Sequence, residues 1–312
     1  MGSLAGEKVL IGPSSFAAMD PSPMDMLVKA GAEVVDNPYK RRLTKDELRA
    51  LLTEGITGLI AGLEPLDRDV LSSSGLKVIS RCGSGMSNVD TKAADELGIL
   101  VRYTPDAPVE SVAELALGAM LSLLRMVPLM DSQLHEGKWT KKIGTLLEGK
   151  TVAIIGFGRI GRRLSELLAP FNAKVLAVDP FLDGGVDEYD IVSLNAALPQ
   201  ADIISIHSSG EACVLGQEEF DMMKRGAFLL NVARGSLVEE NALVKALDEG
   251  RIAGAYLDVF WQEPYTGPLV KYPQVILTPH VGSYTKECRK RMETEAADNL
   301  IEAFGKIKGG QI

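Results

Sequence analysis

The stretch that decides the fold runs Val152–Ala153–Ile154–Ile155–Gly156–Phe157–Gly158–Arg159–Ile160–Gly161. Its apolar first half predicts a buried strand, and its second half is a Gly-x-Gly-x-x-Gly turn that leads into a helix. In such a turn the first glycine allows the sharp bend, the second lets a pyrophosphate approach the backbone, and the third lets helix and strand pack closely. The N–H groups at the start of the helix then hold the phosphates. The residues assigned to this dinucleotide site are Gly156, Gly158, Arg159, Ile160 and Gly161.

A second predicted strand, Lys174–Val178, is followed by an acidic residue, Asp179, which lies 18 positions after Gly161. At this place in the motif a carboxylate accepts hydrogen bonds from the ribose hydroxyls of NAD and would repel the 2′-phosphate of NADP. Pro180 and Phe181 come next, where an NADP site would need arginine or lysine. We therefore predict NAD as the cofactor; for the glycine motif alone, the alternative is an ordinary surface turn.

The length of 312 residues exceeds the usual size of one hydrophobic core, so two domains are expected. Strand and helix signals alternate before residue 105 and again after residue 150, which predicts the α/β class with parallel sheets wrapped by helices. Residues 104–108 break the pattern and are interpreted as a hinge. We expect two doubly wound, Rossmann-like or flavodoxin-like domains. An NAD-binding domain, 105–286, would be inserted into a substrate-binding (catalytic) domain made of 1–104 and 287–312.

Residues Val109–Leu124 predict a long helix that is apolar nearly all round, so we expect it to be buried between domains or between subunits. This expectation implies a homodimer formed through that helix. In the first domain, Thr44 and Glu47 form a capping box at the start of another helix.

The formal net charge is −9, and the only basic cluster, Lys40–Arg41–Arg42, is interpreted as a solvated loop. Nucleic-acid binding requires a basic face, so nucleic acid is not expected as a partner. No run of about 18 apolar residues is present, so no membrane-spanning helix is expected. Three widely spaced cysteines without a Cys-x-x-Cys pair argue against a disulfide framework and against a zinc site. We predict no metal and expect a cytoplasmic location.

Several segments, in one order along the chain, resemble the D-2-hydroxyacid dehydrogenase (D-isomer specific) family. They are residues 81–90, 112–114, the glycine turn at 156–161, 231–235, 257–264 and 278–282. The resemblance covers nearly the whole chain, and within the family it looks closest to phosphoglycerate dehydrogenases without their C-terminal regulatory domain. It implies hydride transfer between nicotinamide and C2 of a small D-2-hydroxy acid or 2-keto acid. The stereochemistry rests on the resemblance alone.

Arg234, Glu263 and His280 are the expected catalytic residues. His280 would be the acid–base group, because an imidazole gains and loses a proton near neutral pH. By the pattern of the family Glu263 lies beside it, where a carboxylate favours the protonated imidazole and fixes its orientation. Arg234 offers a planar fork of donors for the substrate carboxylate and the polarised keto oxygen. Taken singly, these residues could be a structural arginine, one half of a surface ion pair and a surface histidine.

The turn at residues 83–85 follows a predicted strand and is expected to bind the substrate carboxylate through backbone N–H groups. The alternative is a simple strand-to-helix turn. Arg81 could hold a second anion such as a phosphate, or form a solvent-exposed ion pair. We therefore assign Arg81, Ser84, Gly85 and Arg234 to substrate binding.

Three further residues are expected at the cofactor. The resemblance implies that Asp258 binds the carboxamide, that Ala233 flanks the nicotinamide, and that Ser208 touches the cofactor. There is one departure in this region. The family usually has proline two residues after the position of His207, and this chain has Ser209, which puts the shape of the loop in doubt. His207 itself is interpreted as structural.

The sequence thus predicts an NAD-dependent D-2-hydroxyacid dehydrogenase, or 2-ketoacid reductase, with a substrate of the 3-phosphoglycerate or glycerate/hydroxypyruvate type. Two alternatives remain open. One is an NAD(H)-sensing, corepressor-like binding protein, in which the cofactor sets the oligomeric state and turnover is incidental. The other is a formate or phosphite dehydrogenase on the same scaffold.

Overall fold

A computed structural model describes residues 2–53, 55–182, 184–186 and 189–311 of the chain. The chain divides into two compact units. Unit 1 consists of Met1–Pro108 and Ser283–Ile312, and unit 2 is Val109–Gly282, so unit 2 is inserted into unit 1. The two junctions each lie four residues from the boundaries expected from the sequence.

Unit 1 is built on a parallel five-stranded sheet with the strand order β2-β1-β3-β4-β5. This order is the flavodoxin-like form of the doubly wound fold. Its strands are β1 (Lys8–Ile11), β2 (Glu33–Asp36), β3 (Gly58–Ala61), β4 (Val78–Arg81) and β5 (Leu100–Tyr103). Its helices are α1 (Ser22–Lys29), α2 (Lys45–Leu52), α3 (Arg68–Ser72), α4 (Thr91–Glu96) and α11 (Lys286–Lys308).

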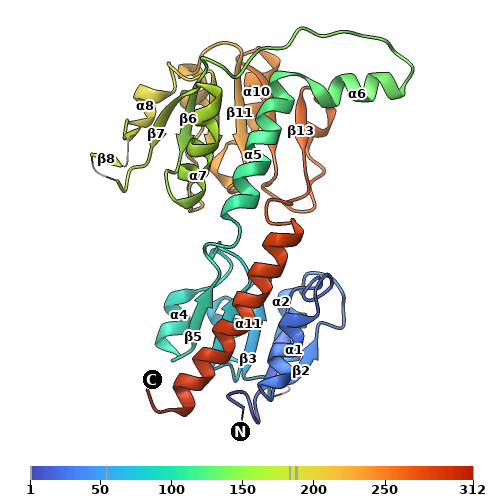
Figure 1. Cartoon of the computed structure of the whole chain (residues 1–312), viewed down its shortest axis with the longest axis vertical. Helices are drawn as coiled ribbons and strands as arrows, with labels where there is room; N and C mark the ends of the chain where they lie inside the picture. The colour runs from blue at the N-terminus through green and yellow to red at the C-terminus, as the bar shows by residue number, and fades with distance from the viewer. Residues whose placement is uncertain (1, 54, 183, 187–188, 312) are drawn as a thin grey trace. The chain divides into compact units, whose positions relative to one another are not determined.

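Both faces of this sheet are buried, because side chains alternate along each strand. Val9 and Ile11 of β1 pack in one core with residues of α1 and α11, and Figure 1 shows these two helices side by side. Leu10 lies between them in sequence and packs in the opposite core, which includes residues of α2, α3 and α4. The expected capping box starts α2: Thr44 Oγ1 accepts from the Glu47 N–H, and Glu47 Oε2 accepts from the Thr44 N–H.

Unit 2 is built on a parallel six-stranded sheet with the order β13-β12-β11-β10-β6-β7. Its strands are β6 (Thr151–Ile155), β7 (Lys174–Val178), β10 (Ile203–Ile206), β11 (Ala227–Asn231), β12 (Ile252–Leu257) and β13 (Val275–Leu277). The other elements are α5 (Val109–Leu124), α6 (Val127–His135), α7 (Arg159–Leu168), α8 (Leu194–Ala197), α9 (Gln217–Met222), α10 (Glu240–Asp248), a small antiparallel pair β8 (Gly185–Val186) and β9 (Tyr189–Asp190), and the short 3₁₀ turns η1 (Ala169–Phe171), η2 (Gly235–Leu237) and η3 (Pro268–Lys271). The predicted pair of parallel α/β domains is confirmed.

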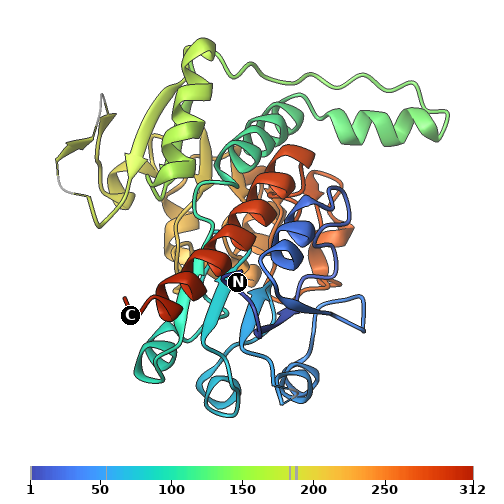
Figure 2. The same cartoon turned by 60° about the horizontal axis from the view of Figure 1, so that its bottom comes forward.

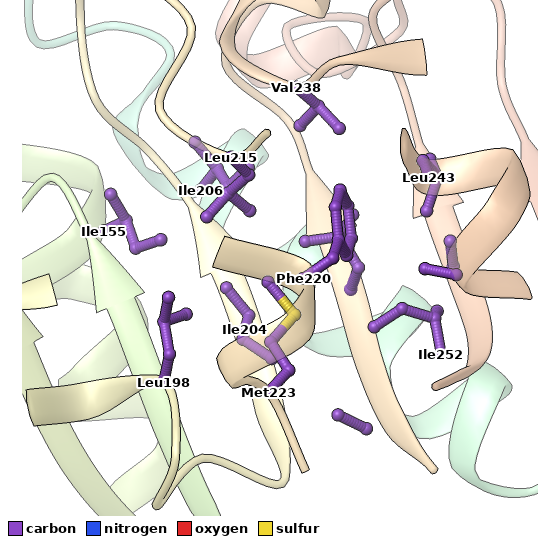
Figure 3. Close-up of a cluster of buried hydrophobic side chains, with 14 of the residues drawn as sticks. Ile155, Leu198, Ile204, Ile206, Leu215, Phe220, Met223, Val238, Leu243 and Ile252 are labelled. Atoms are coloured by element: carbon purple, nitrogen blue, oxygen red, sulfur yellow. The ribbon is translucent and has the colours of Figure 1, made fainter. Parts of the chain in front are cut away.

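One face of the unit 2 sheet packs against α8, α9 and α10. Figure 3 shows this core, in which Ile155, Ile204 and Ile206 of the sheet meet Leu198, Phe220 and Leu243 from the helical side. Each such side chain contributes about 1.5–3 kcal/mol when it is fully buried. The core therefore fixes the positions of these strands, and the candidate site lies at their carboxyl ends.

The opposite face packs against α5 and α7, and this observation corrects one expectation. We expected α5 to be buried between domains or subunits, but Ala116, Met120 and Leu123 of α5 lie in the core of unit 2 itself, together with Ile154 of β6 and Leu164 of α7. An apolar helix is equally well explained by burial against its own sheet. The homodimer predicted through this helix stays a prediction, which the packing within unit 2 does not test.

The sequence analysis did not anticipate α6. Figures 1 and 2 both show α6, and the chain that follows it up to β6, reaching out from the sheet of unit 2. No residue of α6 is buried. In the segment after it Trp139 is 80% exposed and Ile143 is 97% exposed. We call residues 127–146 the arm.

No single helix in the described part of the chain is both long and apolar enough to cross a membrane. Within the described ranges, α5 and α6 taken together reach the required length and composition, but they meet at a bend of 65°.

Candidate active site

The candidate residues of unit 2 all follow the carboxyl ends of its parallel strands. Gly156 comes directly after β6, Asp179 after β7, and His207 after β10. Asp258 comes directly after β12, and the loop with His280 begins after β13. In an open parallel sheet this edge is where ligands bind, because loops with free side chains and helix N-termini gather there. The six-stranded sheet thus brings residues that are far apart in sequence to one edge.

The three motif glycines have the geometry that the sequence analysis required of them. Gly156 has φ +92°, and a Cβ there would lie 2.3 Å from the Ser208 nitrogen. A Cβ on Gly161 would lie 2.3 Å from the Gly156 oxygen, so only glycine lets α7 pack on the turn. A Cβ on Gly158 would meet nothing within 4 Å. Space therefore lies open over the turn, where the first N–H groups of α7, including those of Arg159 and Ile160, have no partner within the helix.

Asp179 closes the other side of this turn. Its Oδ2 accepts from the Phe157 N–H at 2.9 Å, and its Oδ1 accepts from the Phe181 N–H at 3.0 Å. Each carboxylate oxygen can accept more than one hydrogen bond. The carboxylate is thus oriented by the backbone of the glycine turn and keeps capacity for ribose hydroxyls.

The loop after β10 carries two buried polar atoms without a hydrogen-bond partner among the described residues, Ser208 Oγ and His207 Nδ1. The other ring nitrogen of His207, Nε2, lies 2.7 Å from Ser205 Oγ. Burial lowers the pKa of His207 to about 3, so the ring is neutral, in agreement with a structural role. The backbone of Ser208 packs against Gly156, since a Cβ on Gly156 would lie 2.3 Å from the Ser208 nitrogen, and the Ser208 hydroxyl is buried. An orphaned hydroxyl beside an open glycine turn fits a bound dinucleotide.

The turn after β11 is held by the buried side chain of Asn231. Its Nδ2 donates to the Arg234 carbonyl at 2.7 Å, and its Oδ1 accepts from the Ala233 N–H at 3.0 Å. Gly235 packs against the loop after β12, since a Cβ there would lie 2.1 Å from the Phe260 carbonyl carbon. This turn places Ala233 and Arg234 at the same edge of the sheet as the glycine turn. The Arg234 guanidinium donates to the Ala233 carbonyl at 2.6 Å.

His280 and Glu263 are in contact. The imidazole Nδ1 lies 3.1 Å from Oε1 and 3.0 Å from Oε2 of Glu263. Glu263 Oε1 also accepts from the Phe260 N–H at 3.2 Å. The two side chains are 32% and 29% exposed, so a ligand can reach them. Because Nδ1 is turned to the carboxylate, Nε2 is the ring nitrogen left for chemistry.

Asp258 is buried, with 1% of its surface exposed. Most of the hydrogen-bond acceptor positions of its carboxylate are occupied by groups of the protein. It accepts from the Thr278 hydroxyl at 2.6 Å and from the N–H groups of Val281 and Gly282, both at 2.8 Å. Three bonds leave one acceptor position for a ligand. The expected contact with a carboxamide thus has room, but the observed contacts hold the loop around His280.

Arg81 in unit 1 is not the solvent-exposed residue that one interpretation expected, since it is 5% exposed. Its guanidinium donates to the Cys82 carbonyl and to Asn88 Oδ1. It also lies over the next turn, because a Cβ on Gly83 would be 2.4 Å from Arg81 Nη1. The cation is therefore committed within unit 1.

Of the predicted anion-binding turn at residues 83–85, only part is available to bind an anion. The Gly83 N–H donates to Thr104 Oγ1 at 2.8 Å and to the Arg81 carbonyl at 3.0 Å, so it serves the fold. Ser84 is exposed and Gly85 is partly exposed. The backbone N–H groups of Ser84 and Gly85 are the ones left to receive a carboxylate.

Sequence reasoning missed Glu64, which is 1% exposed at the carboxyl edge of the unit 1 sheet. Its Oε1 accepts from the Gly62 N–H at 2.8 Å, and a Cβ on Gly12 would lie 2.2 Å from the same oxygen. Burial raises the pKa of Glu64, while the Gly62 N–H and the charges of Arg81 and Arg42 act in the opposite direction. The available signal was a carboxylate three residues after the apolar strand β3. Roles for Tyr256 and Thr278 were also missed.

The comparisons with known proteins agree with this geometry. The sequence profile described as D-isomer specific 2-hydroxyacid dehydrogenase, NAD binding domain, matches residues 117–282. The chain is 35% identical over 305 residues to the human protein D-3-phosphoglycerate dehydrogenase, covering 95% of this chain and 56% of that protein. The chain thus spans about half the length of the curated relatives it matches.

Two solved structures extend the comparison. The TT0316 protein from Thermus thermophilus is 34% identical, with a TM-score of 0.87 and 97% of each chain covered. The NADPH-dependent glyoxylate/hydroxypyruvate reductase from Sinorhizobium meliloti is 30% identical, with a TM-score of 0.82 over 94% of this chain and 92% of that chain. The chain therefore belongs to the D-isomer specific 2-hydroxyacid dehydrogenase family, and its unit 2 contains the NAD-binding domain of that family.

Proposed function

We propose that this chain is an NAD-dependent oxidoreductase that interconverts a small D-2-hydroxy acid and the matching 2-keto acid. The observation that carries the proposal is the contact between His280 Nδ1 and the Glu263 carboxylate at the sheet edge that also bears the glycine turn. The same edge carries Arg234. This reaction requires a group that transfers a proton, a guanidinium that binds the substrate carboxylate, and a turn that binds the dinucleotide.

The roles of the residues follow from their chemistry. When bound, the nicotinamide supplies or accepts a hydride at C4. His280 gives a proton through Nε2 to the substrate oxygen at C2 during reduction, and takes it back during oxidation. Glu263 holds the ring in place through Nδ1. Arg234 binds the substrate carboxylate and polarises the keto oxygen.

The cofactor contacts are proposed along the same edge. Gly156, Gly158 and Gly161, with the N–H groups of Arg159 and Ile160, would hold the pyrophosphate. Asp179 would bind the ribose, Ser208 would use its orphaned hydroxyl, and Ala233 and Asp258 would face the nicotinamide. The negative charge of Asp179 favours NAD over NADP, although the Sinorhizobium meliloti relative is NADPH-dependent.

For the substrate we propose a three-carbon acid; within unit 1, the domain predicted to bind the substrate, the N–H groups of Ser84 and Gly85 are the candidates for an acid group. The human relative carries the name of a phosphoglycerate dehydrogenase, whereas the Sinorhizobium relative carries that of a glyoxylate/hydroxypyruvate reductase. The burial of Arg81, and its bonds to Cys82 and Asn88, favour an unphosphorylated acid. A phosphate needs exposed cationic donors, and this arginine is committed elsewhere.

We also propose a homodimer, now formed through the arm rather than through α5. The arm presents Trp139 and Ile143 at 80% and 97% exposure in the single chain. Large apolar side chains grouped on a projecting segment commonly mark a surface that a partner covers.

The test is oxidation of NADH with matched 2-keto acids. Hydroxypyruvate and its 3-phosphate share one carbon skeleton and differ by the phosphate alone, and formate and phosphite are tested in the reverse direction with NAD. We expect turnover with hydroxypyruvate and a loss of turnover in His280→Ala. NADH binding without turnover of any acid would instead favour the corepressor-like alternative. Turnover of formate or phosphite alone would favour the alternative that the chain is a formate or phosphite dehydrogenase.

A further inference from the structure

A chain of partly buried hydrogen bonds leads from strand β12 to the loop that carries His280. Tyr256 and Asp258 are two positions apart, so both side chains leave the strand on the same face. The Tyr256 hydroxyl lies 2.7 Å from Thr278 Oγ1, and the Thr278 hydroxyl donates to Asp258 Oδ1 at 2.6 Å. Thr278 has one hydroxyl proton, and it is given to the carboxylate. The tyrosine must therefore be the donor to the threonine.

The Asp258 carboxylate holds the backbone on both sides of His280. On one side it receives Thr278, and on the other it accepts from the N–H groups of Val281 and Gly282. The Gly282 carbonyl in turn accepts from Ser111 Oγ at 2.6 Å. The loop is thus fastened at three points around a single residue.

That residue has an unusual backbone conformation. His280 has φ +55°, in the left-handed region that favours glycine. A side chain persists in this region only where its surroundings impose it, and such positions cluster at functional sites. The Asp258 contacts hold the backbone on both sides of His280, and the His280 N–H itself donates to the Thr278 carbonyl at 2.9 Å. The same conformation sets the imidazole Nδ1 against Glu263.

Burial keeps the Tyr256 hydroxyl protonated, so that it remains a hydrogen-bond donor to Thr278. Tyr256 and Asp258 are each 1% exposed. Burial raises the pKa of Tyr256 well above its ordinary value, so the hydroxyl keeps its proton at every pH at which the protein is handled. A buried hydrogen bond to a carboxylate is stronger than one in water, which suits a fixed support.

We propose that Tyr256 and Thr278 are positioning residues, which act through Asp258 to hold His280 in the conformation that places its ring against Glu263. Neither touches the reacting groups. The proposal rests on the proposed function only for its kinetic consequence, because the conformation of His280 can be observed without any reaction.

The first experiment is NMR of the imidazole groups in the cofactor-free protein. The chain has three histidines, so the spectrum is simple, and the His280 signal is assigned with His280→Gln. Thr278→Val keeps the shape and removes the hydroxyl, Tyr256→Phe removes the outer donor, and Thr278→Ser restores the hydroxyl. We expect the His280 signal to shift or broaden in the first two and to return toward wild type in the third.

The control is Tyr272→Phe, which removes a hydroxyl that donates to Asp248 at the surface of the same unit, at 2.8 Å. His135 and His207 serve as internal references that should not move. An unchanged His280 signal in Thr278→Val overturns the proposal. So does an equal disturbance of all three histidine signals, which would indicate general loosening.

The second experiment is kinetic. Tyr256→Phe should lower kcat about tenfold, the usual effect of losing one buried hydrogen bond, with KM for hydroxypyruvate and the Kd for NADH within about twofold. Combining Tyr256→Phe with Thr278→Val should be no worse than Thr278→Val alone, because the bonds are in series. Additive losses, or a change confined to KM, would contradict the proposal. If no acid is turned over by the wild type, the proposed function fails, and the NMR result still decides this inference.

Discussion

His280 Nδ1 and the Glu263 carboxylate lie 3.0 Å apart although 17 residues separate them in the chain. A carboxylate at this distance orients the imidazole through its Nδ1 atom. The pairing makes the roles of the two residues separable by mutation.

His280→Ala should lower kcat about 10²- to 10⁴-fold, which is the contribution of a positioned acid–base group. Glu263→Gln keeps a hydrogen-bonding partner but removes the charge, so we expect a smaller loss of about tenfold. The measurement is steady-state NADH oxidation, with NADH binding followed by fluorescence as the control for an intact cofactor site. Turnover near wild type in His280→Ala would exclude this histidine as the acid–base group.

Asp179 is expected to decide the choice of cofactor. The wild type should use NADH at least about 100-fold more efficiently than NADPH, because a like charge against the 2′-phosphate costs several kcal/mol. Asp179→Asn removes the charge and keeps one oxygen for the Phe157 or Phe181 N–H, so it should narrow this gap to about tenfold. The ratio of kcat/KM values for the two cofactors gives the answer. Equal efficiency in the wild type would remove the argument from this carboxylate.

We expect Glu64 to make the free energy of unfolding depend on pH in the direction opposite to that of most carboxylates. Burial raises the pKa of Glu64 in the folded state, so the folded chain favours the protonated form. Below the ordinary pKa the group is protonated in both states and costs nothing, whereas above the raised pKa the full cost of a buried charge applies. Glu64→Gln should therefore increase the free energy of unfolding at pH 8, and the gain should vanish as the pH falls toward 4. Urea unfolding across this range measures it.

The matched control is Glu7→Gln, a second buried carboxylate in unit 1. Burial alone would raise the pKa of Glu7, but Thr57 and Lys77 together lower it below its ordinary value. A lowered pKa stabilises the fold above the ordinary pKa, and this stability is lost as the pH falls. Glu7→Gln should thus destabilise at pH 8, with the loss shrinking in acid. Slopes of the same sign for the two variants would contradict the account of Glu64.

The arm predicts the oligomeric state. Trp139→Ser with Ile143→Ser should convert a dimer to a monomer without lowering the melting temperature of unit 2, since both side chains are exposed within the chain. Val270→Ser changes an apolar residue that is 58% exposed outside the arm and should leave the dimer intact. Sedimentation velocity distinguishes these cases. A wild type that is monomeric throughout the micromolar range would rule out the dimer.

The fold was largely predictable because its signals are local. Residues 152–161 indicate a strand, a turn and a helix by their order alone. Gly161 is needed for a contact within the same stretch, and Gly156 for a contact with the loop after the neighbouring strand β10. The boundaries of α5 were also found without error. The sheet against which α5 packs was not predicted, because an apolar helix surface does not indicate which element covers it.

The set of site residues stays a prediction, and the sequence anticipated their arrangement only in part. Arg234, Glu263 and His280 were named from the sequence, and the contact between Glu263 and His280 was expected. A solvent-exposed ion pair was one of two interpretations of Arg81, and the residue is buried instead, because Gly83 leaves room for its guanidinium. Glu64 was passed over, because a single carboxylate after a strand is ordinarily solvated.

The sequence by itself determined the α/β class, the insertion of one unit in the other, and which residues follow the ends of the strands, since each depends on neighbours within a few positions. Only the tertiary structure decided which of these groups meet. Tyr256, Thr278 and Asp258 are joined by hydrogen bonds that require β12 and β13 to lie in parallel register, and the left-handed backbone of His280 follows from those bonds. Hydrogen bonds between distant segments depend on the packing of the sheet, and no local pattern of residues encodes it.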